Sequence, residues 1–142
     1  MNAYVELKNR HQEEINNFPL GFAFSKKQFN EMMVDRFGLT PEDTDRIYHI
    51  GMGGYVRKSD ADAFHEIIER HERERKEAIR ENKDDYLYQM FNYELANHEY
   101  SYTGDVRDTL EALDLTMEDV NADERMVDAL HRACKHQMEK DW

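Results

Sequence analysis

Apolar residues recur at helical spacing along most of the chain. The first series begins at Tyr4 and predicts an amphipathic helix over residues 3–17. Further series and capping signals predict helices over residues 25–37, 60–81, 84–100 and 123–140, with short helices that begin near Asp105 and Thr116. The hydrophobic pattern therefore predicts a mostly helical protein.

A second pattern, rich in β-branched and aromatic residues, interrupts the helical one. Residues 46–50 and 55–57 flank the glycine-rich run 51–54, which is typical of a β-hairpin over residues 46–57. A further extended stretch, residues 20–24, can pair with this hairpin. The sequence thus predicts an α+β fold: a mostly helical single domain over residues 1–142 with a small antiparallel sheet.

Two segments carry nearly the same helix-start signal. Residues 39–43 read LTPED and residues 115–119 read LTMED, each with a threonine three residues before an aspartate. Proline is favoured at the first position of a helix, so the first segment also predicts a helix start. Shared local physics explains the similarity better than duplication of a longer unit.

Length and cysteine content limit the class of protein. A chain of 142 residues is long enough to bury a hydrophobic core as one domain. The single cysteine, Cys134, excludes an intramolecular disulfide and favours a reducing compartment. The sequence has no signal-peptide core and no apolar run of about 18 residues. We therefore expect a cytoplasmic protein that does not enter a membrane.

The net charge of -12 is concentrated in one stretch. Between Asp84 and Asp128 there are thirteen acidic residues and two basic ones, a net charge of -11. Such a stretch repels phosphate and anionic lipid and attracts basic surfaces. We expect no direct binding to nucleic acid and no membrane binding, and we expect a basic protein surface as partner. The alternative is a solvated acidic face on a structural or regulatory subunit.

Tyrosines lie within the same stretch and give it the composition of a protein interface. An acidic surface on a folded scaffold can imitate backbone phosphates and occupy a groove that binds nucleic acid. The residues that we expect to bind the partner are Glu99, Tyr100, Tyr102, Asp105, Asp108, Glu111, Asp114, Glu118 and Asp119.

Glu94 and His98 are the most suggestive pair for metal chemistry. They are four residues apart, so one helix face carries both, and His65 is a candidate third ligand of a metal-dependent hydrolase or metal-binding protein. The competing interpretation is a core histidine held by a carboxylate. We favour the second interpretation, because no third ligand has diagnostic spacing.

No other motif indicates catalysis. The run Gly51-Met52-Gly53-Gly54 lacks the lysine and serine or threonine of a phosphate-binding loop, and hairpin geometry explains its glycines. Cys134 lies on an apolar helix face, where a core cysteine is the simplest interpretation. We therefore expect a protein that is not an enzyme and that needs no cofactor. The sequence leaves the oligomeric state open.

Three runs cover most of the chain from Phe18 onward: FPLGFAFSKKQF, DTDRIYHIGMGGYVRKSDADAFHEIIERH and MFNYELANHEYSYTGDVRDTLEALDLTMEDVNAD. They resemble a family of small uncharacterised acidic proteins of gut Firmicutes, encoded on prophages and on integrative or conjugative elements. The family assigns no catalytic residue. The resemblance implies an accessory protein of a mobile element, such as an anti-CRISPR or anti-restriction inhibitor.

Overall fold

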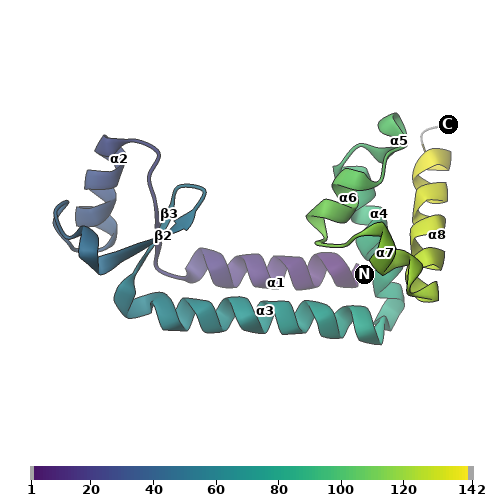
Figure 1. Cartoon of the computed structure of the whole chain (residues 1–142), viewed down its shortest axis with the longest axis horizontal. Helices are drawn as coiled ribbons and strands as arrows, with labels where there is room; N and C mark the ends of the chain where they lie inside the picture. Colours follow the sequence, from purple (N-terminus) through teal and green to yellow (C-terminus); the bar gives the residue numbers. More distant parts are fainter. Residues whose placement is uncertain (1, 141–142) are drawn as a thin grey trace. The chain divides into compact units, whose positions relative to one another are not determined.

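The computed structural model describes residues 2–140 and has an α+β fold (Figure 1). The predicted mostly helical fold with a small antiparallel sheet is confirmed. Residue contacts divide the chain into two compact units. We call Asn9–Glu74 the sheet unit, and the residues up to Lys8 together with those from Arg75 onward the helical unit. The single domain over residues 1–142 stays a prediction.

Three short antiparallel strands form the sheet, in the order β1-β3-β2. They are β1 (Leu20–Phe22), β2 (Ile47–Gly51) and β3 (Gly54–Arg57). The hairpin turn requires glycine, because Gly51, Met52 and Gly53 all have positive φ angles, of 88°, 52° and 74°. The predicted hairpin and the predicted third strand are therefore both present.

One face of the sheet is covered by helix α2 (Lys26–Glu31) and the π-helical turn η1 (Met32–Arg36). Gly21 marks the close approach, because a Cβ atom there would lie 2.6 Å from the sulfur of Met32. The buried apolar residues of this small core are Ala23, Met32, Met33, Phe37 and Ile47.

The helix start predicted at Thr40 is wrong. The carboxylate of Asp43 accepts hydrogen bonds from the backbone N–H and the hydroxyl of Thr40, at 2.9 and 3.0 Å, and closes a turn. Only one 3-10 turn, η2 (Thr44–Arg46), separates this turn from β2. The capping contacts form as predicted, but the chain then enters the sheet and no helix follows.

Helices α1 (Ala3–Asn17) and α3 (Ala61–Glu81) match their predicted ranges. The 3-10 turns η3 (Lys58–Asp60) and η4 (Lys83–Asp85) flank α3. Within the sheet unit, polar contacts join α1 to α3. The imidazoles of His11 and His71 stack with centroids 3.8 Å apart. Glu14 accepts a hydrogen bond from Arg70, and its carboxylate lies 3.2 Å from Nε2 of His71.

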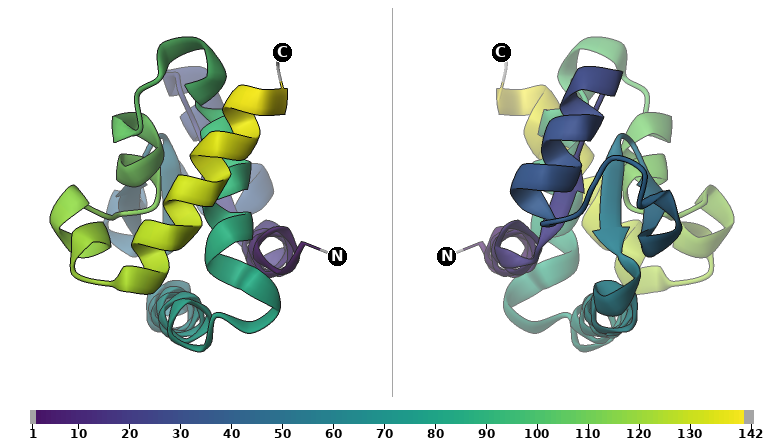
Figure 2. Two further views of the ribbon diagram at one scale, coloured as in Figure 1. Left: turned by 90° about the vertical axis from the view of Figure 1, so that its right-hand side faces the viewer. Right: turned by 90° about the vertical axis from the view of Figure 1, so that its left-hand side faces the viewer.

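The helical unit is built on α4 (Tyr86–Asn97) and α8 (Glu124–Lys140), which pack against each other. Three short helices join them: α5 (Tyr100–Thr103), α6 (Arg107–Ala112) and α7 (Met117–Asn121) (Figure 2). The most deeply buried apolar side chains of this core are Leu87, Met90, Phe91, Leu95, Val120, Ala129 and Ala133. No helix formed by residues 2–140 is both long and apolar enough to cross a membrane.

The Glu14 carboxyl predicts a pH dependence of stability. The hydrogen bond from Arg70, followed by that from His71, lowers its pKa from 4.5 to about 2. A lowered folded-state pKa contributes stability that is present above the unfolded value and is lost as pH falls toward the folded value. We expect wild-type stability to fall between about pH 4.5 and pH 2, and Glu14→Gln to lose less over that range. Urea unfolding across this range measures both, and equal losses would contradict the assignment.

Candidate functional site

The residues predicted to bind a partner lie on α5, α6, α7 and their connections, all in the helical unit (Figure 2). We call their carboxylates the acidic surface: Glu99, Asp105, Asp108, Glu111, Asp114, Glu118 and Asp119. All are exposed except Asp105, which is half-buried. Six of these seven side chains therefore face solvent.

Apolar side chains fix the orientation of α6 and α7. Leu110 and Val120 are buried in the core, and Thr109 is fully buried beside them. The Thr109 hydroxyl donates a hydrogen bond of 3.3 Å to the backbone carbonyl of Glu94 on α4. With these residues turned inward, the carboxylates on the opposite side of each short helix face solvent.

Two carboxylates of the acidic surface make contacts that stabilise the fold. Asp105 forms an ion pair of 2.6 Å with Arg107, whose hydrogen bonds lower the pKa of the Asp105 carboxyl. Asp119 closes a capping box with Thr116, accepting a bond of 2.9 Å from its backbone N–H. These two side chains have structural roles at the starts of α6 and α7.

Three other acids of the same stretch are also paired. Arg132 on α8 donates to Asp85 at 2.8 Å and to Asp128 at 2.9 Å, and Arg125 donates to Asp123 at 2.9 Å. These bonds lower the pKa of the Asp85 and Asp123 carboxyls. The unpaired negative charge of the stretch between Asp84 and Asp128 is therefore carried by carboxylates other than these three.

Five carboxylates of the acidic surface form no ion pair or hydrogen bond with any residue between 2 and 140: Glu99, Asp108, Glu111, Asp114 and Glu118. Asp108 and Glu118 lie in the first turns of α6 and α7, where a helix favours negative charge. Glu111 lies in the last turn of α6 and Asp114 just beyond it. Glu99 follows the end of α4 and is the N-cap residue of α5. Negative charge at Glu111 and Asp114 is unfavourable for α6.

The two tyrosines predicted to bind the partner differ in accessibility. Tyr102 is 90% exposed beside the acidic surface. Tyr100 is half-buried and shares a hydrogen bond with Cys134, which raises the pKa of the tyrosine. Tyr102 is thus available as an aromatic contact, whereas Tyr100 attaches α5 to α8.

Glu94 lies in the core of the helical unit with its side chain only 4% exposed. Lys8 Nζ lies 3.3 Å from one carboxylate oxygen, and His98 Nε2 lies 3.7 Å from the other. Burial, followed by the charge of Glu94, raises the pKa of Tyr4. Sequence spacing predicted the contact with His98. It missed Lys8 and Tyr4, because they come from a helix 86 residues or more away in sequence.

The metal alternative lacks its third ligand. Nε2 of His65 lies 2.9 Å from Glu69 on the exposed side of α3, in the sheet unit. Among residues 2–140 no group of three or more histidine, cysteine, aspartate or glutamate side chains can hold a metal ion. The predicted set Glu94, His98 and His65 is not among such groups. Glu94 is buried in the core, whereas the side chain of His98 beside it is 29% exposed.

The site is thus an exposed, largely unpaired acidic surface on a small α+β protein. Residues 3–136 match the family of unknown function DUF7659, and the chain belongs to this family. Comparisons with curated proteins and with solved structures found no match.

The Glu94 cluster predicts a graded effect of two substitutions. Glu94→Gln removes the charge that holds Lys8 and should lower the free energy of unfolding by about 1–3 kcal/mol. His98→Ala should cost less than about 1 kcal/mol, because its contact is longer and its side chain is partly exposed. Thermal unfolding measures both, with the exposed change Lys135→Gln as control. A stoichiometric metal in the wild type that is lost in Glu94→Gln would contradict the core assignment.

The unfavourable charges at the end of α6 predict that their removal stabilises the fold. Glu111→Gln with Asp114→Asn should raise the free energy of unfolding by about 0.5 kcal/mol through the helix dipole. Asparagine also suits the left-handed backbone at position 114, where φ is 56°. The comparison variant, Asp123→Asn with Asp128→Asn, removes two ion-paired carboxylates and should lower the free energy of unfolding instead. A loss of stability in the first variant would show that Glu111 or Asp114 supports the fold.

Proposed function

We propose that the protein is a non-enzymatic binding protein whose acidic surface docks on the basic groove of a nucleic-acid-handling protein and blocks it. The target class that we propose is a nuclease of a host defence system. The protein would then be an anti-CRISPR or anti-restriction inhibitor of a mobile element. The link to prophages and conjugative elements rests on the resemblance of the sequence runs given above. Such targets act in the cytoplasm, so we propose that compartment for the protein.

The observation that carries this proposal is the position of Glu111 and Asp114. They lie in the last turn of α6 and just beyond it, without a cationic partner. Solubility alone is served equally well by charges at helix N-termini, where they also stabilise the fold. Carboxylates that persist where they cost stability support a role in binding.

The chemistry of such a surface suits a groove lined with lysine and arginine. Exposed, unpaired carboxylates are free to accept charge-assisted hydrogen bonds from guanidinium groups. Their combined field raises the association rate with a basic partner. Tyr102, nearly fully exposed beside them, offers aromatic contact area at low entropic cost. A partner groove filled in this way is closed to nucleic acid.

The proposal predicts that binding depends on the unpaired carboxylates as a group. The test variant carries Glu99→Gln, Asp108→Asn, Glu111→Gln, Asp114→Asn and Glu118→Gln. The control variant removes the same number of exposed charges from the sheet unit, through Glu13→Gln, Glu42→Gln, Asp45→Asn, Asp62→Asn and Glu66→Gln. Pull-downs from host lysate should recover basic proteins with the wild type and the control, and should lose them with the test variant. Duplex DNA should displace the captured proteins, because both compete for one groove.

Two further results decide between this proposal and its alternatives. In gel-shift titrations the protein itself should not bind DNA or RNA near physiological salt, because its net charge of -12 repels phosphate. Equal capture by the test and control variants would assign the acidic surface to solvation alone, as on a structural or regulatory subunit. The test variant should melt no lower than the wild type, so that lost capture reports binding and not unfolding.

A further inference from the structure

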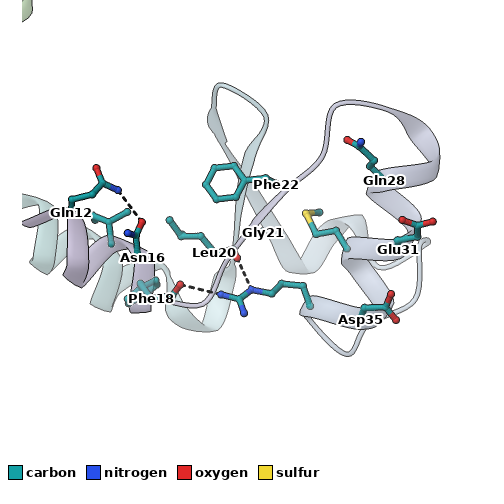
Figure 3. A pocket seen from close by; sticks show the side chains of 12 residues that line it. Gln12, Asn16, Phe18, Leu20, Gly21, Phe22, Gln28, Glu31 and Asp35 are labelled. Carbon is teal, nitrogen blue, oxygen red and sulfur yellow. Dashed lines mark hydrogen bonds between the residues drawn. The ribbon is translucent and has the colours of Figure 1, made fainter. Parts of the chain in front are cut away.

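A groove of about 560 Å³ lies along the outer edge of β1 in the sheet unit (Figure 3). This volume lies within the range of ligand sites in proteins. One wall is the C-terminal half of α1, with Gln12, Ile15 and Asn16, and the other is formed by α2 and η1. Leu20 and Phe22 point toward α1 (Figure 3), whereas Gly21 between them is in close contact with Met32. The groove belongs to a different unit from the acidic surface, and the inference below is independent of the proposed function.

The groove exposes the unpaired backbone N–H and C=O of one residue, Phe22, in an edge strand. Ala23 donates a backbone hydrogen bond of 2.9 Å to the carbonyl of Gly53, which directly precedes β3, and Phe22 pairs in register with Gly54 on β3. In an antiparallel ladder, residues alternate between those bonded to the neighbouring strand and those that face away. The N–H and C=O of Phe22 therefore point away from β3, into the open edge.

Side chains close the rest of that edge. Nε of Arg36 donates to the carbonyl of Leu20 at 2.6 Å, and its Nη2 donates to the carbonyl of Phe18 at 3.2 Å. At the other end, the side-chain oxygen of Gln28 accepts from the N–H of Phe24 at 2.8 Å. Proteins commonly block sheet edges in this way. The block leaves a gap at Phe22, whose side chain is 58% exposed.

The two walls of the groove differ in polarity. Ile15 and Phe22 line the side toward α1. Glu31 and Asp35 line the side toward α2 and η1; both are exposed, and neither carboxylate forms an ion pair or hydrogen bond with a residue between 2 and 140. Arg36 contributes the positive charge of the lining, and its guanidinium is held by the carbonyls of Leu20 and Phe18. Two carboxylates against one guanidinium leave the lining with a net negative charge.

We propose that this groove binds an extended peptide segment of a partner protein with the pattern basic–apolar–basic. The central residue exchanges two backbone hydrogen bonds with Phe22, as residues do across an antiparallel strand pair. Its apolar side chain then lies on the same face as Phe22, toward Ile15. The two neighbouring side chains point to the opposite face, where Glu31 and Asp35 pair with lysine or arginine.

The probe is a short fluorescent peptide of alternating lysine and valine. Its control has the same composition with all lysines first, so that it carries equal charge without alternation. The alternating peptide should bind saturably in fluorescence anisotropy and shift the backbone amide signal of Phe22 in NMR spectra. The control peptide, with all lysines first, should bind at least about tenfold more weakly. It cannot place basic and apolar side chains on opposite faces.

Variants of exposed residues test the two halves of the site. Glu31→Gln with Asp35→Asn should weaken binding of the alternating peptide about tenfold, whereas Glu42→Gln with Asp45→Asn should not change it. Phe22→Pro removes the outward N–H but no bond to β3, so it should weaken binding more than Phe22→Ala does. Thermal unfolding of each variant shows that the sheet unit is intact.

Three outcomes would overturn the inference. Equal binding of the two peptides would reduce the effect to general attraction by acidic side chains. Unchanged binding in the Glu31 and Asp35 variant would place the peptide elsewhere. A dimer in sedimentation experiments that dissociates in Phe22→Pro would assign the open edge to a second copy of this chain.

Discussion

The carboxylate of Glu94 lies in the apolar core of the helical unit, where an unpaired charge would be strongly unfavourable. Lys8 and Tyr4 from α1 and His98 from the end of α4 surround it and make its burial possible. The backbone carbonyl of the same residue accepts the hydrogen bond of Thr109 on α6. One residue thus connects the start of the chain, the central helix and the helix that carries the acidic surface. The direction in which Asp108 and Glu111 project depends on this packing.

Charge in the acidic stretch has two different physical roles. Asp105 and Asp119 satisfy backbone groups at helix starts, and Asp85 with Asp128 holds Arg132 on α8. These contacts stabilise the fold and need no partner. Glu111 and Asp114 have no such contact and lie where the dipole of α6 disfavours them. The formal charge of the stretch therefore overstates the number of carboxylates available to a partner, and the structure identifies which ones remain.

Local sequence patterns predicted most of the fold because the helices are amphipathic and their starts are capped. The capping box of Thr116 and Asp119 formed as predicted, and α7 follows it. Thr40 and Asp43 form the same kind of contact without a helix. The difference arises after the cap: Val120 is buried against the core, whereas Ile47 enters the sheet. Tertiary packing decides whether a helix follows the cap, and the capping residues themselves do not specify that packing.

The parts of the sites that sequence could not predict depend on distant residues. Periodicity placed Glu94 and His98 on one face, but nothing local indicates that Lys8 reaches the same carboxylate. The groove beside β1 is likewise invisible in sequence, because it arises from which edge of the sheet stays open and from the reach of Arg36.

The central claim is that unpaired carboxylates on α5–α7 steer the protein onto a basic partner. The most direct measurement is the association rate constant with a captured partner, followed by surface plasmon resonance between about 0.05 M and 0.5 M salt. The account predicts that the rate falls steeply with salt and that the dissociation rate changes far less. An association rate independent of salt would contradict the account, because contacts other than charge would then determine recognition.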